Sequence, residues 1–129
     1  MSIITTHVLD TVLGKPAAGI AVLLERQEGG NWIEVSSDDD SSELVQDAPG
    51  DWVEVSTGVT DPDGRCRGLD ENAEPGLYRL TFSTGAYFEE LGRVSIYPEI
   101  SITFNCGGEA HYHLPLLLSD NGYTTYRGS

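Results

Sequence analysis

The sequence predicts an all-β protein, an antiparallel β-sandwich with one short helix. Apolar and polar residues alternate with a period of two through most of the chain, as in strands with one buried face. Turn-forming clusters of Gly, Pro, Asn and Asp separate these segments and leave six to eight short strands. A chain of 129 residues suits one domain, and we expect residues 1–129 to form it.

The first predicted strand covers residues 3–10. Residues 3, 5, 7 and 9 fall on one of its faces, and residues 4, 6, 8 and 10 fall on the other. Gly14-Lys15-Pro16 is typical of a turn. A second strand follows at 20–24, and we expect it to end at the polar Arg26-Gln27-Glu28.

Two similar segments, 32–36 and 52–56, each alternate like a strand. The acidic, Ser-rich sequence between them cannot bury enough apolar area to fold by itself. We therefore expect an acidic insertion around 36–52, either as an extended hairpin or as a partly mobile loop, in a compact sheet protein.

The middle of the chain begins with a strong turn signal, Asp61-Pro62-Asp63-Gly64. Strands are predicted at 77–82 and 100–104. Between them, 85–92 is predicted as a short helix, with Tyr87, Phe88 and Leu91 on one side.

The C-terminal part contains a nearly apolar strand over 112–118, in which Pro115 points to a sheet edge or a bulge. Asp120-Asn121-Gly122 predicts a tight turn, and 123–126 is the last predicted strand. Every element of the sandwich is therefore short and closed by a turn signal.

The charge of the chain excludes two classes of partner. Its 21 acidic and 7 basic side chains give a net charge of -14, whereas nucleic acids and anionic membranes bind basic surfaces. Residues 34–54 hold eight of the acids and no Lys or Arg. This acidity has two interpretations: a solvated acidic loop on an ordinary protein, or adaptation to a salt-rich cytoplasm in which ions screen self-repulsion.

The sequence has no run of about 20 apolar residues, and its first residues lack the basic and apolar regions of a secretory signal. We therefore expect a cytoplasmic protein with Cys66 and Cys106 as reduced thiols. Arg65 and Arg67 flank Cys66 and would favour its thiolate, although a small apolar filler is the commoner role. The cysteines lack metal-ligand spacing, and the pair His111 and His113 has no obvious third ligand, so we predict no metal and no other cofactor.

Candidate catalytic residues are few, because the chain has three histidines and seven basic residues. Each histidine taken alone is more often structural than catalytic. Together, however, His7, His113, Arg65 and Arg127 form a coherent set. Imidazoles relay protons to and from water near neutral pH, and guanidiniums hold a planar, carbonyl-rich anion and stabilise a developing oxyanion. No Gly-x-Ser-x-Gly nucleophile motif is present, which favours direct attack by water.

Four segments resemble the signatures of 5-hydroxyisourate hydrolases of the transthyretin-like family. They are TTHVLD at 5–10 with GKPA at 14–17, TDPDGR at 60–65, HYHLPLLLS at 111–119 and GYTTYRGS at 122–129. The ending is the most specific of these, because the carrier protein transthyretin shares the fold but lacks the Tyr-Arg-Gly-Ser tail and these histidines.

The resemblance implies a transthyretin-like (prealbumin) sandwich and a homotetramer with sites at subunit interfaces. It implies that water opens the ring of 5-hydroxyisourate to give 2-oxo-4-hydroxy-4-carboxy-5-ureidoimidazoline, in urate degradation. The family's functional residues carry over by position to the catalytic residues His7, Arg65, His113 and Ser129, and to the substrate-binding residues Tyr126, Arg127 and Gly128.

The chain departs from the family pattern at two points. Asp120 stands where the family usually has proline, and the insertion around 36–52 exceeds the usual spacing. A non-catalytic, transthyretin-like carrier of a small ligand is the alternative function that the same resemblance leaves open.

Overall fold

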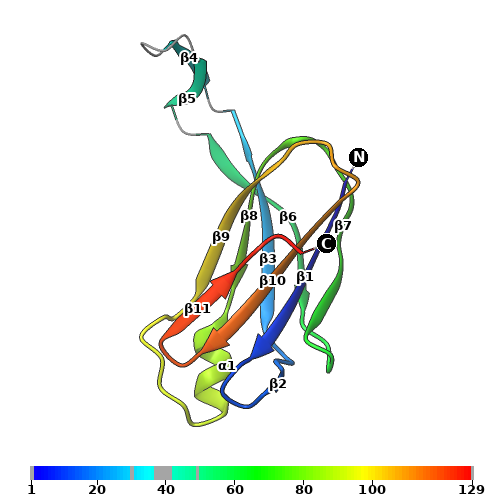
Figure 1. Ribbon diagram of the computed structural model, residues 1–129, viewed down its shortest axis with the longest axis vertical. Helices are drawn as coiled ribbons and strands as arrows, with labels where there is room; N and C mark the ends of the chain where they lie inside the picture. Colours follow the sequence, from blue (N-terminus) through cyan, green and yellow to red (C-terminus); the bar gives the residue numbers. More distant parts are fainter. Residues whose placement is uncertain (1, 30, 37–41, 49, 129) are drawn as a thin grey trace.

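A computed structural model describes residues 2–29, 31–36, 42–48 and 50–128, and it confirms the predicted β-sandwich (Figure 1). In the first sheet, β11 (Gly122–Thr125), β10 (His111–Ser119) and β1 (Ser2–Asp10) lie in that order, and the far edge of β1 pairs with both β2 (Lys15–Pro16) and β7 (Arg65–Ala73). The second sheet has the order β6 (Asp51–Val59), β3 (Ala21–Glu28), β8 (Gly76–Phe82) and β9 (Ile100–Cys106). A separate hairpin joins β4 (Asn31–Ser36) to β5 (Ser42–Ala48) and projects from one end of the sandwich.

The pairing of β1 with β10 is parallel, whereas every other ladder among the described residues is antiparallel. Its register runs without a break from Ile3 opposite His111 to Asp10 opposite Leu118. The first strand of the chain, β1, therefore lies beside β10, which is close to the C-terminus. This contact brings residues more than 100 positions apart onto one sheet face.

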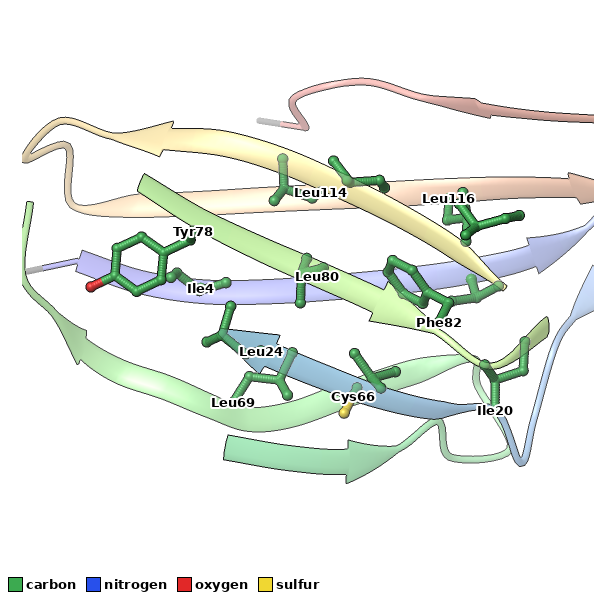
Figure 2. Close-up of a cluster of buried hydrophobic side chains, with 14 of the residues drawn as sticks. Ile4, Ile20, Leu24, Cys66, Leu69, Tyr78, Leu80, Phe82, Leu114 and Leu116 are labelled. Atoms are coloured by element: carbon green, nitrogen blue, oxygen red, sulfur yellow. The ribbon is translucent and has the colours of Figure 1, made fainter. Parts of the chain in front are cut away.

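The core fills the space between the two sheets (Figure 2). In β1, burial alternates as predicted, with Ile4 and Val8 buried and His7 only partly buried. Leu24 and Leu80 face them from the second sheet and are fully buried. Burial of each such apolar side chain stabilises the fold by about 1.5–3 kcal/mol. Because the inner face of β1 supplies this stabilisation, its outer face can carry polar side chains.

One carboxylate, Asp10, lies on the buried face at the end of β1. Tyr87 of α1 (Thr84–Glu90) donates a hydrogen bond of 2.8 Å to it, and Arg93 forms an ion pair with it. Burial alone would raise the pKa of Asp10, but the hydrogen bonds from Arg93, the Leu13 amide and Tyr87 outweigh it and lower the pKa. Arg93 also pairs with Asp120, so the residue that replaces the family's proline has an electrostatic partner here.

Several predicted details differ in the structure. The polar end of the 20–24 segment continues as strand to Glu28, because it pairs with the start of β6. Pro115 makes no bulge in the β1 ladder, but the β11 ladder begins only at Leu116, so the proline lies where that side of β10 is a local edge. Leu91 is 48% exposed rather than packed under the helix. No helix in the described part of the chain has the length and apolar character needed to cross a membrane.

Candidate active site

The candidate site lies on the outer face of the first sheet, where β10, β1 and β7 run side by side (Figure 1). The parallel register places Thr5 opposite His113, and the antiparallel register with β7 places His7 opposite Arg65. The side chains of His7 and His113 are partly buried, and Arg65 is exposed. Three predicted catalytic residues from three separate parts of the sequence therefore share one face.

The predicted turn before β7 positions Arg65. The Asp61 carboxylate accepts the backbone N–H groups of Asp63 (2.9 Å) and Arg65 (3.0 Å). Gly64 has φ 78°, and a Cβ at this position would be 2.2 Å from the carbonyl oxygen of Val8. Only glycine allows this close approach, and the turn therefore packs directly against β1.

The same turn determines which nitrogen of His7 carries a proton. Its Nε2 lies 2.7 Å from the carbonyl oxygen of Asp63, and a carbonyl can only accept a hydrogen bond. Nε2 is therefore the protonated nitrogen. In the neutral ring Nδ1 keeps the lone pair and is the atom able to accept a proton.

His113 is the best candidate for a general base. Burial lowers its pKa below the ordinary value of 6.5, and the charges of His111, Arg65 and His7 lower it further. The ring is consequently neutral at neutral pH and able to take a proton from water. Its Nδ1 lies 2.8 Å from the Thr5 hydroxyl, and within the described residues its Nε2 has no hydrogen-bond partner.

The C-terminal tail folds back onto His113. Gly128 forms an isolated bridge with it, and the Gly128 N–H donates a hydrogen bond of 2.7 Å to the His113 carbonyl. A Cβ on Gly128 would lie 2.6 Å from Cδ2 of the His113 ring, so this position requires glycine for close approach. The tail thus forms one wall around the imidazole.

The other tail residues lie differently. The Arg127 guanidinium stacks 4.8 Å from the Tyr112 ring centroid and donates to the His111 carbonyl at 3.3 Å, so within one chain it points away from His113. Tyr126 is 54% exposed. Ser129 falls outside the described residues.

A pocket of about 510 Å³ opens beside this face. Its polar lining includes Arg65 and His113, together with residues that the sequence prediction had not assigned to the site: Thr5, Arg67, Glu71 and His111. The period of two was the available signal, because Thr5 shares a strand face with His7, and His111 shares one with His113. His7 and the tail residues 126–128 are not among the residues that line the pocket.

The pocket is lined mainly by guanidinium and imidazole side chains, in an otherwise acidic protein. Two arginines and two histidines line it, with Glu71 as the acidic residue of the lining. Cys66 also borders it, but the residue is only 2% exposed and burial raises the pKa of its thiol, which does not favour a nucleophile. No group of three or more His, Cys, Asp or Glu side chains in the described ranges is arranged to hold a metal ion.

Comparison with known proteins identifies the family. The model of the HIUase/Transthyretin family matches residues 4–128. The chain belongs to this family. The 5-hydroxyisourate hydrolase of Mus musculus is 41% identical over 130 residues, which cover 98% of this chain and 94% of the mouse protein. Both the family and the fold predicted from the sequence are thereby confirmed.

Solved structures of the family include both of its functional types. The Klebsiella pneumoniae 5-hydroxyisourate hydrolase superposes with a TM-score of 0.74 at 33% identity and full coverage of both chains. Transthyretin from Sparus aurata superposes with a TM-score of 0.78 at 28% identity and covers 99% of this chain and 97% of its own. The fold alone therefore does not separate hydrolase from carrier in this family, and the side chains of the site must decide.

Proposed function

We propose that this member of the HIUase/Transthyretin family is a 5-hydroxyisourate hydrolase. The observation that carries the proposal is the meeting of His7, Arg65 and His113 on one sheet face, with the tail closed over His113 at Gly128. A hydrophobic carrier site has no need for imidazoles beside guanidiniums. Relatives named 5-hydroxyisourate hydrolase share about two-fifths of the sequence over nearly the whole chain.

Each side chain has a role that follows from its surroundings. His113 is neutral, and its Nε2 is free to take a proton from the attacking water. His7, whose Nε2–H is held by the Asp63 carbonyl, keeps a lone pair on Nδ1 and helps to hold and shuttle the proton. Arg65 binds the planar substrate and stabilises the oxyanion that develops when water attacks the ring carbonyl. The reaction is hydrolysis of a cyclic amide bond and produces a carboxylate.

The site is proposed to be completed by subunit contacts in a homotetramer. In a single chain this sheet face is open, and subunit contacts that cover its His113 side while leaving the His111 edge open would exclude water from the reacting groups and strengthen the charge interactions among them. Arg127 turns away from its own pocket toward Tyr112. We therefore propose that Arg127, together with Tyr126 and Ser129, binds substrate only in the assembled tetramer.

The β4–β5 hairpin, which holds the described part of the acidic insertion, lies at the opposite end of the sandwich from α1 (Figure 1). We propose that it decorates a single hydrolase domain, because all the residues that line the pocket belong to β1, β7 and β10.

The decisive experiment follows the ultraviolet absorbance of freshly generated 5-hydroxyisourate with and without the untagged protein. The hydrolase proposal expects decay far above the spontaneous rate, at catalytic protein concentration. A transthyretin-like carrier would instead bind the compound in stoichiometric amount and leave its decay unchanged or slower, and that result would reject the proposal.

A further inference from the structure

The hydroxyl of Thr5 lies between two imidazoles. Its Oγ1 is 2.8 Å from Nδ1 of His113 and 2.7 Å from Nε2 of His111, and the two ring centroids are 6.0 Å apart. A hydroxyl has one proton, so it can donate to only one of the two rings at a time. The other ring must then donate to the hydroxyl. The protonation of His111 and His113 is therefore linked through Thr5.

The two rings differ in exposure and in surrounding charge. His113 is partly buried and faces His111 on its own strand, His7 on β1 and Arg65 on β7, while Arg67 and Glu71 of β7 line the same pocket. His111 is exposed at the edge of that pocket. A proton held on His113 is therefore destabilised by burial and by the positive charge of Arg65, whereas a proton on the exposed His111 can pass to solvent.

We propose that Thr5 and His111 form the route by which His113, after its Nε2 has taken a proton from the attacking water, passes its Nδ1 proton to solvent and later regains it, and this inference rests on the proposed hydrolase function. In the resting site, His113 Nδ1–H donates to Thr5 and the Thr5 hydroxyl donates to His111 Nε2. This arrangement leaves His113 Nε2 with its lone pair free for water. Thr5 is thus a positioning residue, and His111 is the exit of the route.

The protons balance through one turnover. As the water oxygen bonds to the substrate carbonyl, His113 Nε2 takes a proton from that water. His113 Nδ1–H then passes to Thr5 while the Thr5 proton passes to His111 Nε2, and His111 releases a proton from Nδ1 to solvent. When the ring C–N bond breaks, His113 Nε2–H protonates the leaving nitrogen, and Nδ1 is reprotonated through the same route in reverse. The product carboxylic acid ionises, so one proton is released overall.

The alternative is that Thr5 only packs the two rings together. The two roles differ in how the rate depends on buffer, because small bases and acids from solution can replace a missing proton route but cannot repair packing. They also differ in their effect on the histidine tautomers. A relay requires the Nδ1–H form of His113, and the loss of the hydroxyl must change that preference.

The test compares Thr5→Val, which keeps the shape but removes the hydroxyl, with Thr5→Ser, which restores it. Thr81→Val is the matched control, because Thr81 bonds to Ser101 on the other sheet, outside the site. Turnover is measured at low and high concentrations of a small buffer such as imidazole. General acid–base groups contribute about 100-fold or more. We expect Thr5→Val to lose about tenfold in kcat at low buffer and to regain most of it at high buffer, while Thr5→Ser and Thr81→Val stay within about twofold of the parent.

The second measurement is ¹⁵N NMR of the histidine rings, which needs no turnover. The parent protein should show His113 as the Nδ1–H tautomer, and Thr5→Val should shift both His111 and His113. An unchanged tautomer in Thr5→Val, an Nε2–H tautomer in the parent, or a loss of kcat that buffer does not restore would overturn the proposal.

If the parent does not hydrolyse 5-hydroxyisourate, the proposed function fails, but NMR still decides whether Thr5 links the tautomers of His111 and His113. If Thr5→Val does not fold, His111→Asn replaces it and must show the same buffer-restored loss.

Discussion

Replacing Gly128 with alanine tests how tightly the tail controls His113. An alanine Cβ at this position would lie 2.6 Å from the ring Cδ2 and 3.3 Å from Cγ, whereas carbon atoms in ordinary contact are about 3.5–4.0 Å apart. Either the ring or the tail must therefore move by about 1 Å. Movement of the ring strains its 2.8 Å bond to Thr5, and movement of the tail strains the 2.7 Å bond from the Gly128 N–H.

A displacement of about 1 Å at a reacting group costs on the order of 100-fold in rate. We therefore expect Gly128→Ala to lower kcat about 100-fold, while the free energy of unfolding changes by no more than about 1 kcal/mol because the tail is at the surface. Gly107→Ala is the matched control, since its Cβ would meet only the Tyr112 hydroxyl at an ordinary 3.5 Å. Steady-state kinetics and thermal melts measure both effects. A fully active Gly128→Ala protein would refute the reasoning that the tail holds the imidazole in place.

Three further predictions concern charge and the tail. Arg65→Gln removes a positive charge that lowers the pKa of His113, and the pKa of His113 should therefore rise in this variant. The acidic limb of the kcat/KM profile should then move to higher pH, and a limb that stays in place would contradict this. Deleting 127–129 should lower kcat on the order of 100-fold in a protein with an unchanged circular dichroism spectrum, and full activity would exclude a role for the tail. Arg93→Leu leaves a fully buried carboxylate unpaired and should cost about 3–5 kcal/mol in chemical denaturation, whereas Glu74→Gln in an exposed pair should cost less than about 1 kcal/mol; equal losses would contradict the buried network.

Strands with one apolar face could be predicted from the sequence, because the alternation of apolar and polar residues is visible within the segment itself. The segment 3–10 shows this clearly: its pattern correctly placed Thr5 and His7 on the same face, and the structure shows that this face is the outer one. The strand β7 was not predicted. Its buried residues, Cys66, Leu69 and Ala73, are not spaced by two, because the register shifts twice and Gly68 takes φ 73°. Such irregular strands are defined by their partner in space rather than by their own pattern.

The meeting of His7 with His113 could be expected only from the family resemblance, because no local pattern specifies that β1 pairs with β10 in parallel. The period of two put His111 on the same face as His113, but the hydrogen-bonded link between them could not be predicted, because it passes through Thr5, which is 106 residues from His111 in sequence. The direction of Arg127 was also beyond prediction, since it depends on the Tyr112 ring that the tail happens to cross.

The central claim is that a neutral imidazole on this sheet face activates water against 5-hydroxyisourate. The most direct test measures kcat and KM for the parent protein beside His113→Gln, at a pH where the imidazole is neutral. We expect rapid turnover by the parent. For His113→Gln we expect a loss of about 100-fold or more in kcat with a much smaller change in KM. A variant as fast as the parent, or a loss confined to KM, would show that His113 is not the base.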